Sequence, residues 1–369
     1  MLLRDSNNFF VKWLRSLDKT ILILLIIWLS ASIIFCSNTT LTFASIKIYN
    51  DPNYLLKKYY FFLFVGVFIM IIFSFFNDLF FKKSSKFFLL ISIILLILTL
   101  FVGLEVKGSK RWISLFFFNL QPIELLKPFF IVFLSSFLCS DNKFKFKLFF
   151  SFFFVFGVIF ILLLQPDYTQ SLIILALWLI LIFVSGISFF IIFSLIVFAG
   201  SSMIAILFLF KDSFSYIFLR FEKWLSATDI GYQSEKALDA IKYGGFWGRG
   251  IGEGILKEKI PEAHTDYVLA SVSEEFGIFA IIFILLIIIS LFMRVFAITQ
   301  TNISDFRKYT LLGLSSLMLI QIFINVGVTI NLIPSTGMTF PFLSYGGSSI
   351  ITSSITIGII LSLTKNLEK

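Results

Sequence analysis

The chain has 369 residues, of which 59% are hydrophobic and 14% charged, and its mean hydropathy is +1.00. A soluble globular protein would carry about a quarter charged residues, so this composition excludes a soluble enzyme. The net charge of +9 does not point to nucleic acid, because membrane proteins concentrate Lys and Arg in their cytoplasmic loops.

Apolar runs recur along the whole chain, and each is long enough to cross a hydrocarbon core of about 30 Å as a helix. We expect an all-α polytopic membrane protein with about ten spans, forming a single unit over residues 1–369. Strands are not expected, because the apolar runs do not alternate with period 2. The predicted spans are 20–37, 58–76, 86–104, 123–139, 148–164, 169–185, 188–210, 268–293, 309–332 and 347–364.

The predicted orientation follows from the basic residues. Segment 1–19 is basic and lacks a small-residue cleavage site, which is typical of an uncleaved signal-anchor. Lys and Arg in the short loops are concentrated in segments that would be cytoplasmic if the N-terminus were cytoplasmic. This predicts two cytoplasmic termini and a large extracytoplasmic loop at 211–267. Cys36 and Cys139 are too few for a disulfide framework. They are expected on opposite sides of the membrane, Cys36 at the outer end of the first span and Cys139 at the inner end of the fourth.

The predicted fourth span opens with "QPIELLKPFF" and contains two ionisable residues. Glu124 and Lys127 are three positions apart, so they lie on one face of a helix. Each such group costs about 2.5–3.5 kcal/mol to insert into the bilayer. One explanation is an ion pair that merely neutralises itself, and the other is a functional site inside the membrane.

The motif "GSKRWISL" lies just before this span, at the predicted outer boundary of the membrane. Lys110, Arg111 and Trp112 are residue types that anchor membrane proteins at the interface. The same residue types suit an anionic ligand, because Arg111 presents a fork of donors to phosphate oxygens. The sequence leaves both interpretations open.

The long loop contains the glycine-rich stretch "YGGFWGRGIGEG". It does not match a nucleotide-binding loop, since it lacks the Gly-Lys-Ser/Thr ending and follows no strand. A flexible loop and a ligand cradle are equally compatible with its glycines, which are Gly244, Gly245, Gly248, Gly250, Gly252 and Gly254.

The stretch "IPEAHTDYV" holds the single histidine of the chain, His264, followed by Thr265 and Asp266. Either Thr265 or Asp266 can cap the helix predicted after it, which is a common role. A carboxylate at the membrane boundary is also suited to act as a general base in sugar chemistry, with Glu262 nearby. A Ser-His-Asp triad around His264 is formally possible, but no serine lies in a strand-turn-helix elbow.

Other polar residues lie inside predicted spans. Glu274 and Glu275 lie about two turns deeper than Asp266, and amide side chains recur in the ninth span, where they are expected to bond between helices. The small residues of "YGGSS" are expected to allow close helix packing. The amides and small residues are Gln321, Asn325, Asn331, Gly346, Gly347, Ser348 and Ser349. The chain shows no Cys/His spacing typical of a metal site.

The motifs "KRWISL", "QPIELLK", "PEAHTD" and "PFLSYGGSS" occur in one order, and with them the chain resembles the SEDS family (shape, elongation, division and sporulation) over nearly its whole length. The stretch "GRGIGEG" ahead of "PEAHTDYV" is more similar to the division branch than to the elongation branch. Ile123 departs from the family pattern, which usually has a small residue there, but the flanking Gln121, Pro122, Glu124 and Lys127 are retained.

The resemblance implies a peptidoglycan glycosyltransferase that polymerises lipid II outside the bacterial inner membrane, beside a class B penicillin-binding transpeptidase. The essential aspartate of the family corresponds to Asp266, which would be the general base. The predicted substrate-binding residues are Arg111, Glu124, Lys127, His264 and Thr265. No cofactor is identified, and a requirement for a divalent cation stays open. A lipid II flippase and a non-enzymatic division scaffold are the alternatives.

Overall fold

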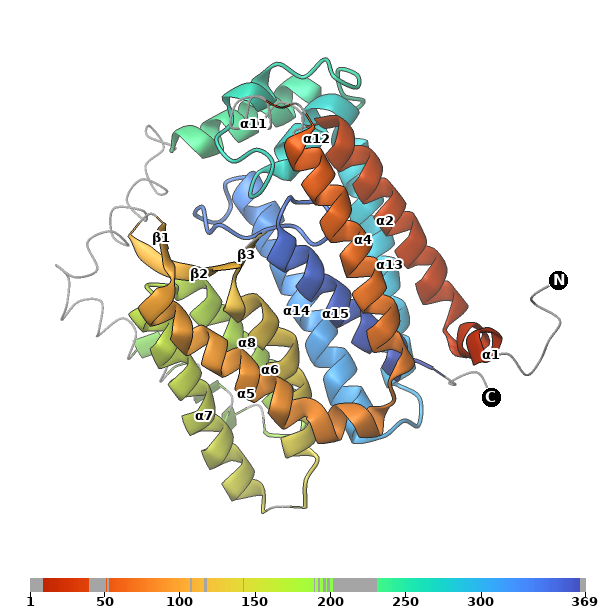
Figure 1. The fold of residues 1–369 in the computed structure, drawn as a ribbon, viewed down its shortest axis with the longest axis vertical. Helices are drawn as coiled ribbons and strands as arrows, with labels where there is room; N and C mark the ends of the chain where they lie inside the picture. The colour runs from red at the N-terminus through yellow and green to blue at the C-terminus, as the bar shows by residue number, and fades with distance from the viewer. Residues whose placement is uncertain are drawn as a thin grey trace.

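The computed structural model describes residues 9–39, 51–201 with short gaps at 52, 107, 116–117, 142 and between 189 and 199, and 231–365. Within these residues the protein is a bundle of helices, and six of them are long and apolar enough to cross a membrane (Figure 1). These are α2 (Lys19–Thr39), α4 (Tyr54–Phe75), α5 (Asp78–Val102), α7 (Phe144–Leu164), α13 (Ile278–Thr299) and α14 (Asp305–Thr329). The shorter apolar helices are α6 (Pro122–Leu138), α8 (Tyr168–Val184) and α15 (Gly347–Leu363).

The predicted all-α membrane fold is confirmed, and most predicted spans match one helix each. The largest shift among these is in the third span, because α5 begins at Asp78 rather than at 86. The side chain of Asn77 caps this helix by accepting from the backbone N–H of Phe80 at 2.9 Å. The seventh span, predicted at 188–210, lies mostly outside the described residues.

The prediction of one continuous eighth span at 268–293 is wrong. The segment forms two helices, α12 (Val268–Phe276) and α13, which are separated at Gly277 with a φ of 80°. A Cβ at Gly277 would lie 2.1 Å from the carbonyl oxygen of Phe246, so another backbone approaches the break directly. The residues just before the break include Ser273, Glu274 and Glu275, but the apolar residues on either side of them led to the prediction of one span.

The expectation of no strands is also wrong for the segment between the third and fourth spans. It forms a three-stranded antiparallel sheet of β1 (Leu104–Val106), β2 (Ser109–Leu115) and β3 (Phe118–Leu120) in the order β1-β2-β3. The period-2 argument concerned long apolar runs, and these strands are short and lie between the helices. The sheet matters for function because Arg111 lies on β2.

The last helix packs closely on α4, as the small residues of its sequence predict. A Cβ at Gly347 would lie 2.8 Å from the ring of Phe62, and one at Gly66 would lie 2.5 Å from the hydroxyl of Ser354. At the start of α15, Ser348 accepts from the backbone N–H of Gln121 at 3.0 Å. The helix therefore holds the entrance of α6 in place.

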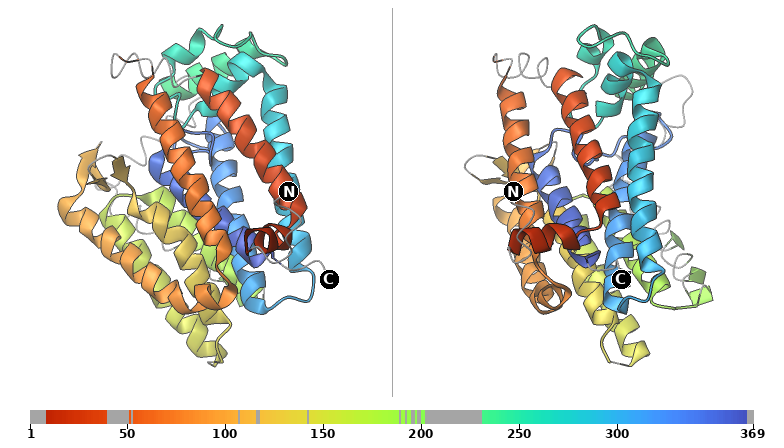
Figure 2. Two further views of the ribbon diagram at one scale, coloured as in Figure 1. Left: turned by 45° about the vertical axis from the view of Figure 1, so that its right-hand side comes forward. Right: turned by 90° about the vertical axis from the view of Figure 1, so that its right-hand side faces the viewer.

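The two ends of the bundle differ in character. Helix α11 (Tyr232–Gly244) and α12 lie together at the upper end of the bundle, where α11 packs on α12 and α14 and α12 packs on α2 (Figure 1). The strands lie at the upper end of α5. The opposite end is tied by ion pairs between Arg294 and Asp18 at 2.7 Å and between Arg307 and Asp78 at 3.2 Å. Helix α1 (Phe9–Ser16) lies across the bundle direction near this end (Figure 2). Both cysteines are free thiols.

Candidate functional site

The predicted pair inside the fourth span is a direct ion pair. Pro122 starts α6, where a missing N–H costs nothing, and this places Glu124 in the first turn. The Nζ of Lys127 donates to the Oε1 of Glu124 at 2.6 Å. The side chain of Lys127 is fully buried and that of Glu124 nearly so. Lys127 therefore contacts the carboxylate rather than an open surface.

Two further helices supply donors to the same carboxylate. The Nε2 of Gln170 on α8 donates to Oε1 of Glu124 at 3.0 Å, and the Nε2 of Gln321 on α14 donates to Oε2 at 3.3 Å. The role of Gln321 as a bond between helices is confirmed. Glu124 is thus the centre of a buried polar network that joins α6, α8 and α14. The donors from α6, α8 and α14 that share this one carboxylate hold the three helices together.

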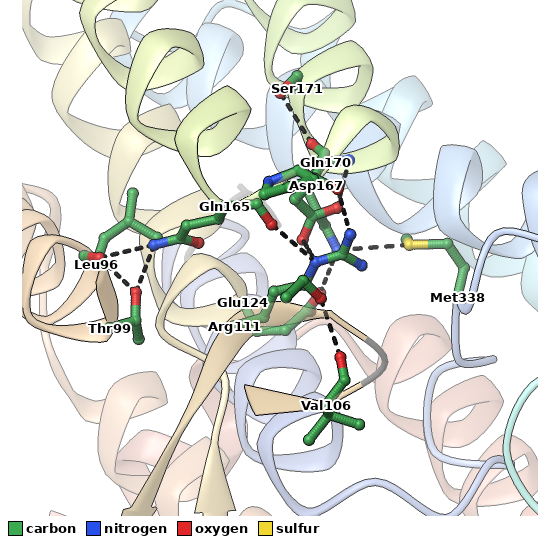
Figure 3. Close-up of polar contacts among 12 residues, drawn as sticks. Leu96, Thr99, Val106, Arg111, Glu124, Gln165, Asp167, Gln170, Ser171 and Met338 are labelled. Atoms are coloured by element: carbon green, nitrogen blue, oxygen red, sulfur yellow. Dashed lines mark hydrogen bonds and ion pairs between the residues drawn. The ribbon is translucent and has the colours of Figure 1, made fainter. Parts of the chain in front are cut away.

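Arg111 lies next to this network and binds the connection between α7 and α8 (Figure 3). Its Nε donates to the carbonyl oxygen of Gln165 at 3.3 Å, and its guanidinium also donates to the carbonyl of Pro166. It forms an ion pair with Asp167 at 3.6 Å. The side chain of Arg111 remains 31% exposed.

Asp167 is a site residue that the sequence analysis did not single out. It caps α8, since its Oδ1 accepts from the backbone N–H of Gln170 at 3.4 Å. Burial raises the pKa of Asp167, while the nearby charges of Arg111 and Lys127 lower it and that of Glu124 raises it. The ion pair with Arg111 is the direct contact of this carboxylate with the predicted site residues. The available signal was the polar stretch "QPDYTQ" between two apolar runs.

The predicted base Asp266 lies in a run of turns that precedes α12. Tyr267, rather than Thr265 or Asp266, occupies the N-cap position of α12, and its side chain makes no capping hydrogen bond. Asp266 is half-buried, and the side chain of Asn325 donates to its backbone carbonyl at 2.9 Å. The carbonyl of Thr265 accepts from the hydroxyl of Ser344 at 2.5 Å. Contacts from distant segments therefore fix this turn.

His264 and Thr265 are held in the same turn. The carbonyl oxygen of His264 accepts from the backbone N–H of Tyr345 at 2.9 Å, and the two rings lie 6.1 Å apart. Burial lowers the pKa of His264, and the charge of Glu262 raises it to a lesser extent. The imidazole is therefore neutral at neutral pH. The hydroxyl of Thr265 donates to the carbonyl of Glu262 at 3.1 Å.

Met338 connects the two groups of predicted site residues. Its sulfur lies 3.5 Å from the Nε2 of Gln170, which is the same nitrogen that donates to Glu124. Its carbonyl oxygen accepts from Asn325 at 2.6 Å, and Asn325 also donates to the backbone of Asp266. The ion pair of α6 and the turn of Asp266 therefore lie on opposite sides of the segment that contains Met338.

The acidic residues of α12 have structural partners. The carboxylate of Glu274 accepts from the backbone N–H groups of Ile255 and Leu256 at 2.7 Å each and from that of Lys257 at 2.6 Å. Glu275 forms an ion pair with the side chain of Lys257. These contacts attach the loop ahead of Asp266 to α12, so the two glutamates support the turn.

The first part of the glycine-rich stretch packs against the backbone at the end of α12. A Cβ at Gly244 or Gly248 would lie 2.1 Å from the carbonyl oxygen of Ser273 or Glu275 respectively. The backbone N–H of Gly250 donates to the carbonyl of Glu275 at 3.0 Å. The glycines let the stretch pack directly on the backbone at the end of α12.

In the part of the chain that the structure describes, no group of three or more His, Cys, Asp or Glu side chains is arranged to hold a metal ion.

Comparisons with known proteins agree with this architecture. The family model of the FtsW, RodA and SpoVE cell cycle proteins matches residues 18–369. A probable peptidoglycan glycosyltransferase FtsW of Nitrosomonas europaea is 33% identical, with 70% of this chain and 69% of that protein covered. Another protein with this name, from Haemophilus influenzae, is 30% identical, with 94% and 90% covered.

Two solved structures share the fold. One belongs to a peptidoglycan synthase complex that coordinates polymerization and crosslinking, with a TM-score of 0.76, 20% identity, and 95% of this chain and 98% of that chain covered. The other is the rod shape determining protein RodA of Thermus thermophilus, with a TM-score of 0.67, 22% identity, and 95% and 97% covered.

Proposed function

This chain belongs to the family of FtsW, RodA and SpoVE cell cycle proteins, and from this premise we propose that it is a peptidoglycan glycosyltransferase that polymerises lipid II. Its curated relatives carry the name of the division member, which supports a role in septal wall synthesis. The observation that carries the proposal is the link from the turn of Asp266 through Asn325 and Met338 to the network of Glu124.

Asp266 acts as the general base in this proposal. Its carboxylate takes the proton from a hydroxyl of the acceptor sugar, and the resulting oxygen attacks the anomeric carbon of the donor. The bond between that carbon and the lipid pyrophosphate breaks, and the pyrophosphate leaves with the bonding electrons. A positioned base of this kind contributes about 10² to 10⁴ in rate.

Arg111 stabilises the leaving group. The pyrophosphate gains negative charge as its bond to the sugar breaks, and Arg111 keeps part of its side chain exposed beside the network. Lys127 contributes through its ion pair with Glu124, because it is fully buried in this structure. The isoprenoid tail of the substrate stays in the bilayer while its pyrophosphate reaches the ends of the helices.

His264 and Thr265 line the acceptor side of the proposed reaction. The imidazole of His264 is neutral, so it can donate or accept a hydrogen bond with a sugar without adding charge beside Asp266. The backbone of both residues is held by the segment around Ser344. This supports a role in substrate binding rather than in proton transfer.

The partner and the location are part of the same proposal. The solved peptidoglycan synthase complex combines polymerization with crosslinking, which supports a class B penicillin-binding transpeptidase as the partner of this chain. The protein is a multi-pass membrane protein. We place it in the bacterial inner membrane at the division septum, with both termini and segment 1–19 in the cytoplasm and the 211–267 loop outside.

The test is polymerisation of lipid II by the purified protein, with and without the transpeptidase. We expect the wild type to make glycan strands and Asp266→Asn to fold, bind its partner and make none, because an amide cannot accept the proton. His264→Gln should be slower but active. A near-normal yield of glycan strands from Asp266→Asn would show that Asp266 is not the general base. If the protein moved lipid II across the liposome membrane without making polymer, it would be a flippase instead. If it showed neither activity, the scaffold would be the remaining alternative.

A further inference from the structure

Two of the most exposed aromatic side chains among the described residues lie next to each other outside the spanning helices. They lie on the segment 243–250, named here the aromatic strap, which connects α11 to the loop ahead of Asp266. Within it Trp247 is 83% exposed and Phe246 is 65% exposed. Exposed aromatic side chains on a water-facing loop are unfavourable unless something covers them.

The backbone of the strap is rigid, so this exposure is built into the fold. The N–H of Arg249 donates to the carbonyl of Glu274 at 2.9 Å, and the N–H of Ile278 donates to the carbonyl of Gly245 at 3.0 Å. Close backbone contact at Gly248 and Gly277 leaves no room for side chains at either position. The backbone that carries the two aromatic rings is therefore tied to the break between α12 and α13.

The strap continues the lipid-facing side of α13. The rings of Trp247 and Phe246 lie 5.0 Å and 5.7 Å from the ring of Phe279, in the first turn of α13. Below Phe279, exposed apolar side chains recur at helical spacing on α13, at Ile282, Phe283, Leu286, Ile289 and Met293. In a helix that spans the membrane such a stripe faces lipid, so the two rings extend it beyond the start of the helix.

Cationic and amphipathic groups lie beside the rings. The guanidinium of Arg249 lies 4.0 Å from the centre of the Tyr243 ring, and its Nε donates to the backbone carbonyl of Tyr243 at 2.7 Å. Lys242 lies in the last turn of α11, directly before the strap. Aromatic rings with Lys and Arg at the end of a lipid-facing stripe are typical of the level of the lipid headgroups.

We propose that the aromatic strap is a membrane anchor, with Phe246 and Trp247 inserted among the lipid headgroups and first acyl carbons of the adjacent leaflet. The cations beside them then face lipid phosphates. Because the strap is bonded to the end of α12, and the turn of Asp266 leads into α12, the anchor fixes the height of that turn above the bilayer. The proposal concerns lipid contact and does not depend on the enzymatic reaction.

The experiment uses the full chain alone in nanodiscs of phosphatidylglycerol and phosphatidylcholine. The lipids carry bromine either near the headgroup or near the chain end, since bromine quenches nearby tryptophan fluorescence. Subtracting the emission of Trp247→Phe from that of the wild type isolates Trp247, once both proteins are shown to melt alike. A water-exposed reference is Glu235→Trp in the Trp247→Phe protein, because Glu235 is exposed on α11.

We expect shallow bromine to quench the Trp247 emission strongly, deep bromine to quench it less, and the reference tryptophan to be quenched by neither. Equal emission from Trp247 in brominated and unbrominated nanodiscs would overturn the proposal. If that emission instead shifted only when the transpeptidase was added, the strap would be a protein-docking surface, which also contradicts a lipid anchor.

Discussion

The side-chain amide of Asn325 donates to the backbone carbonyl of Asp266 at 2.9 Å and to that of Met338 at 2.6 Å. Asn325 is fully buried on α14, so it touches the turn of the proposed base and not the substrate. It is a positioning residue that holds the turn against the segment on the other side of the site.

Replacing the side-chain amide of Asn325 should show whether this residue positions the base or binds the substrate. Asn325→Asp keeps the size but places a carboxylate against two carbonyl oxygens, and a lost buried hydrogen bond costs about 1–3 kcal/mol. We expect kcat for lipid II polymerisation to fall while KM changes little. Thr310→Val is the matched control on the same helix, since Thr310 is also buried on α14 but belongs neither to the turn of Asp266 nor to the network of Glu124. Equal effects of both variants on kcat and KM would contradict a specific role for Asn325.

The ion pair of α6 is expected to be functional rather than self-neutralising. In Glu124→Gln/Lys127→Met both charges are removed together, a change that is often neutral for stability when a buried pair has no other role. We expect the double variant to accumulate and melt near the wild-type temperature but to make no polymer. Melting is followed by tryptophan fluorescence in detergent, and wild-type polymer yield from this variant would show that the pair only neutralises itself.

Glu274 should support the site from a distance. Its carboxylate accepts three backbone N–H groups, and a glutamine would face them with only one oxygen and bring its own donors. Hydrogen bonds to a charged group are worth about 1.5–3 kcal/mol each, so Glu274→Gln should lower the melting temperature and the polymerisation rate. The exposed Glu253→Gln in the same loop is the control and should behave like the wild type.

Acidification should weaken the turn that carries His264. Burial lowers the pKa of His264 in the folded protein, so the unfolded chain takes up its proton at higher pH than the folded one. The contribution of this group to stability is therefore full above the unfolded pKa of about 6.5 and is lost as the pH falls below it. We expect the melting temperature to drop more steeply from pH 7 to 5 for the wild type than for His264→Gln. If the melting temperatures of the two proteins changed identically with pH, His264 would not contribute to the pH dependence of stability.

The orientation in the membrane can be tested at Glu235. A cysteine there, in a protein with Cys36 and Cys139 replaced by serine, should react with an impermeant thiol reagent on intact spheroplasts. Ser234 next to it is unsuitable, because it is buried and its hydroxyl lies 3.2 Å from that of Tyr267. Labelling seen only after lysis would place the loop in the cytoplasm.

The sequence by itself determined the class of the protein and most of its helices. Transfer of an apolar run into lipid depends on the composition of that run alone, so hydropathy located α4, α6 and α15 without knowledge of their neighbours. The pairing of Glu124 with Lys127 was equally local, because helical spacing places both on one face. The importance of Asp266 came from a motif, and the sequence left open whether that residue only capped a helix.

Only the tertiary structure decided how the site is assembled. Arg111 meets Asp167, and Met338 lies between Gln170 and Asn325, because segments far apart in the sequence end at the same side of the bundle. The division of the eighth span was hidden for the same reason. It depends on backbone contact between the aromatic strap and Gly277, and a contact between distant backbones leaves no periodicity in the side chains of either segment.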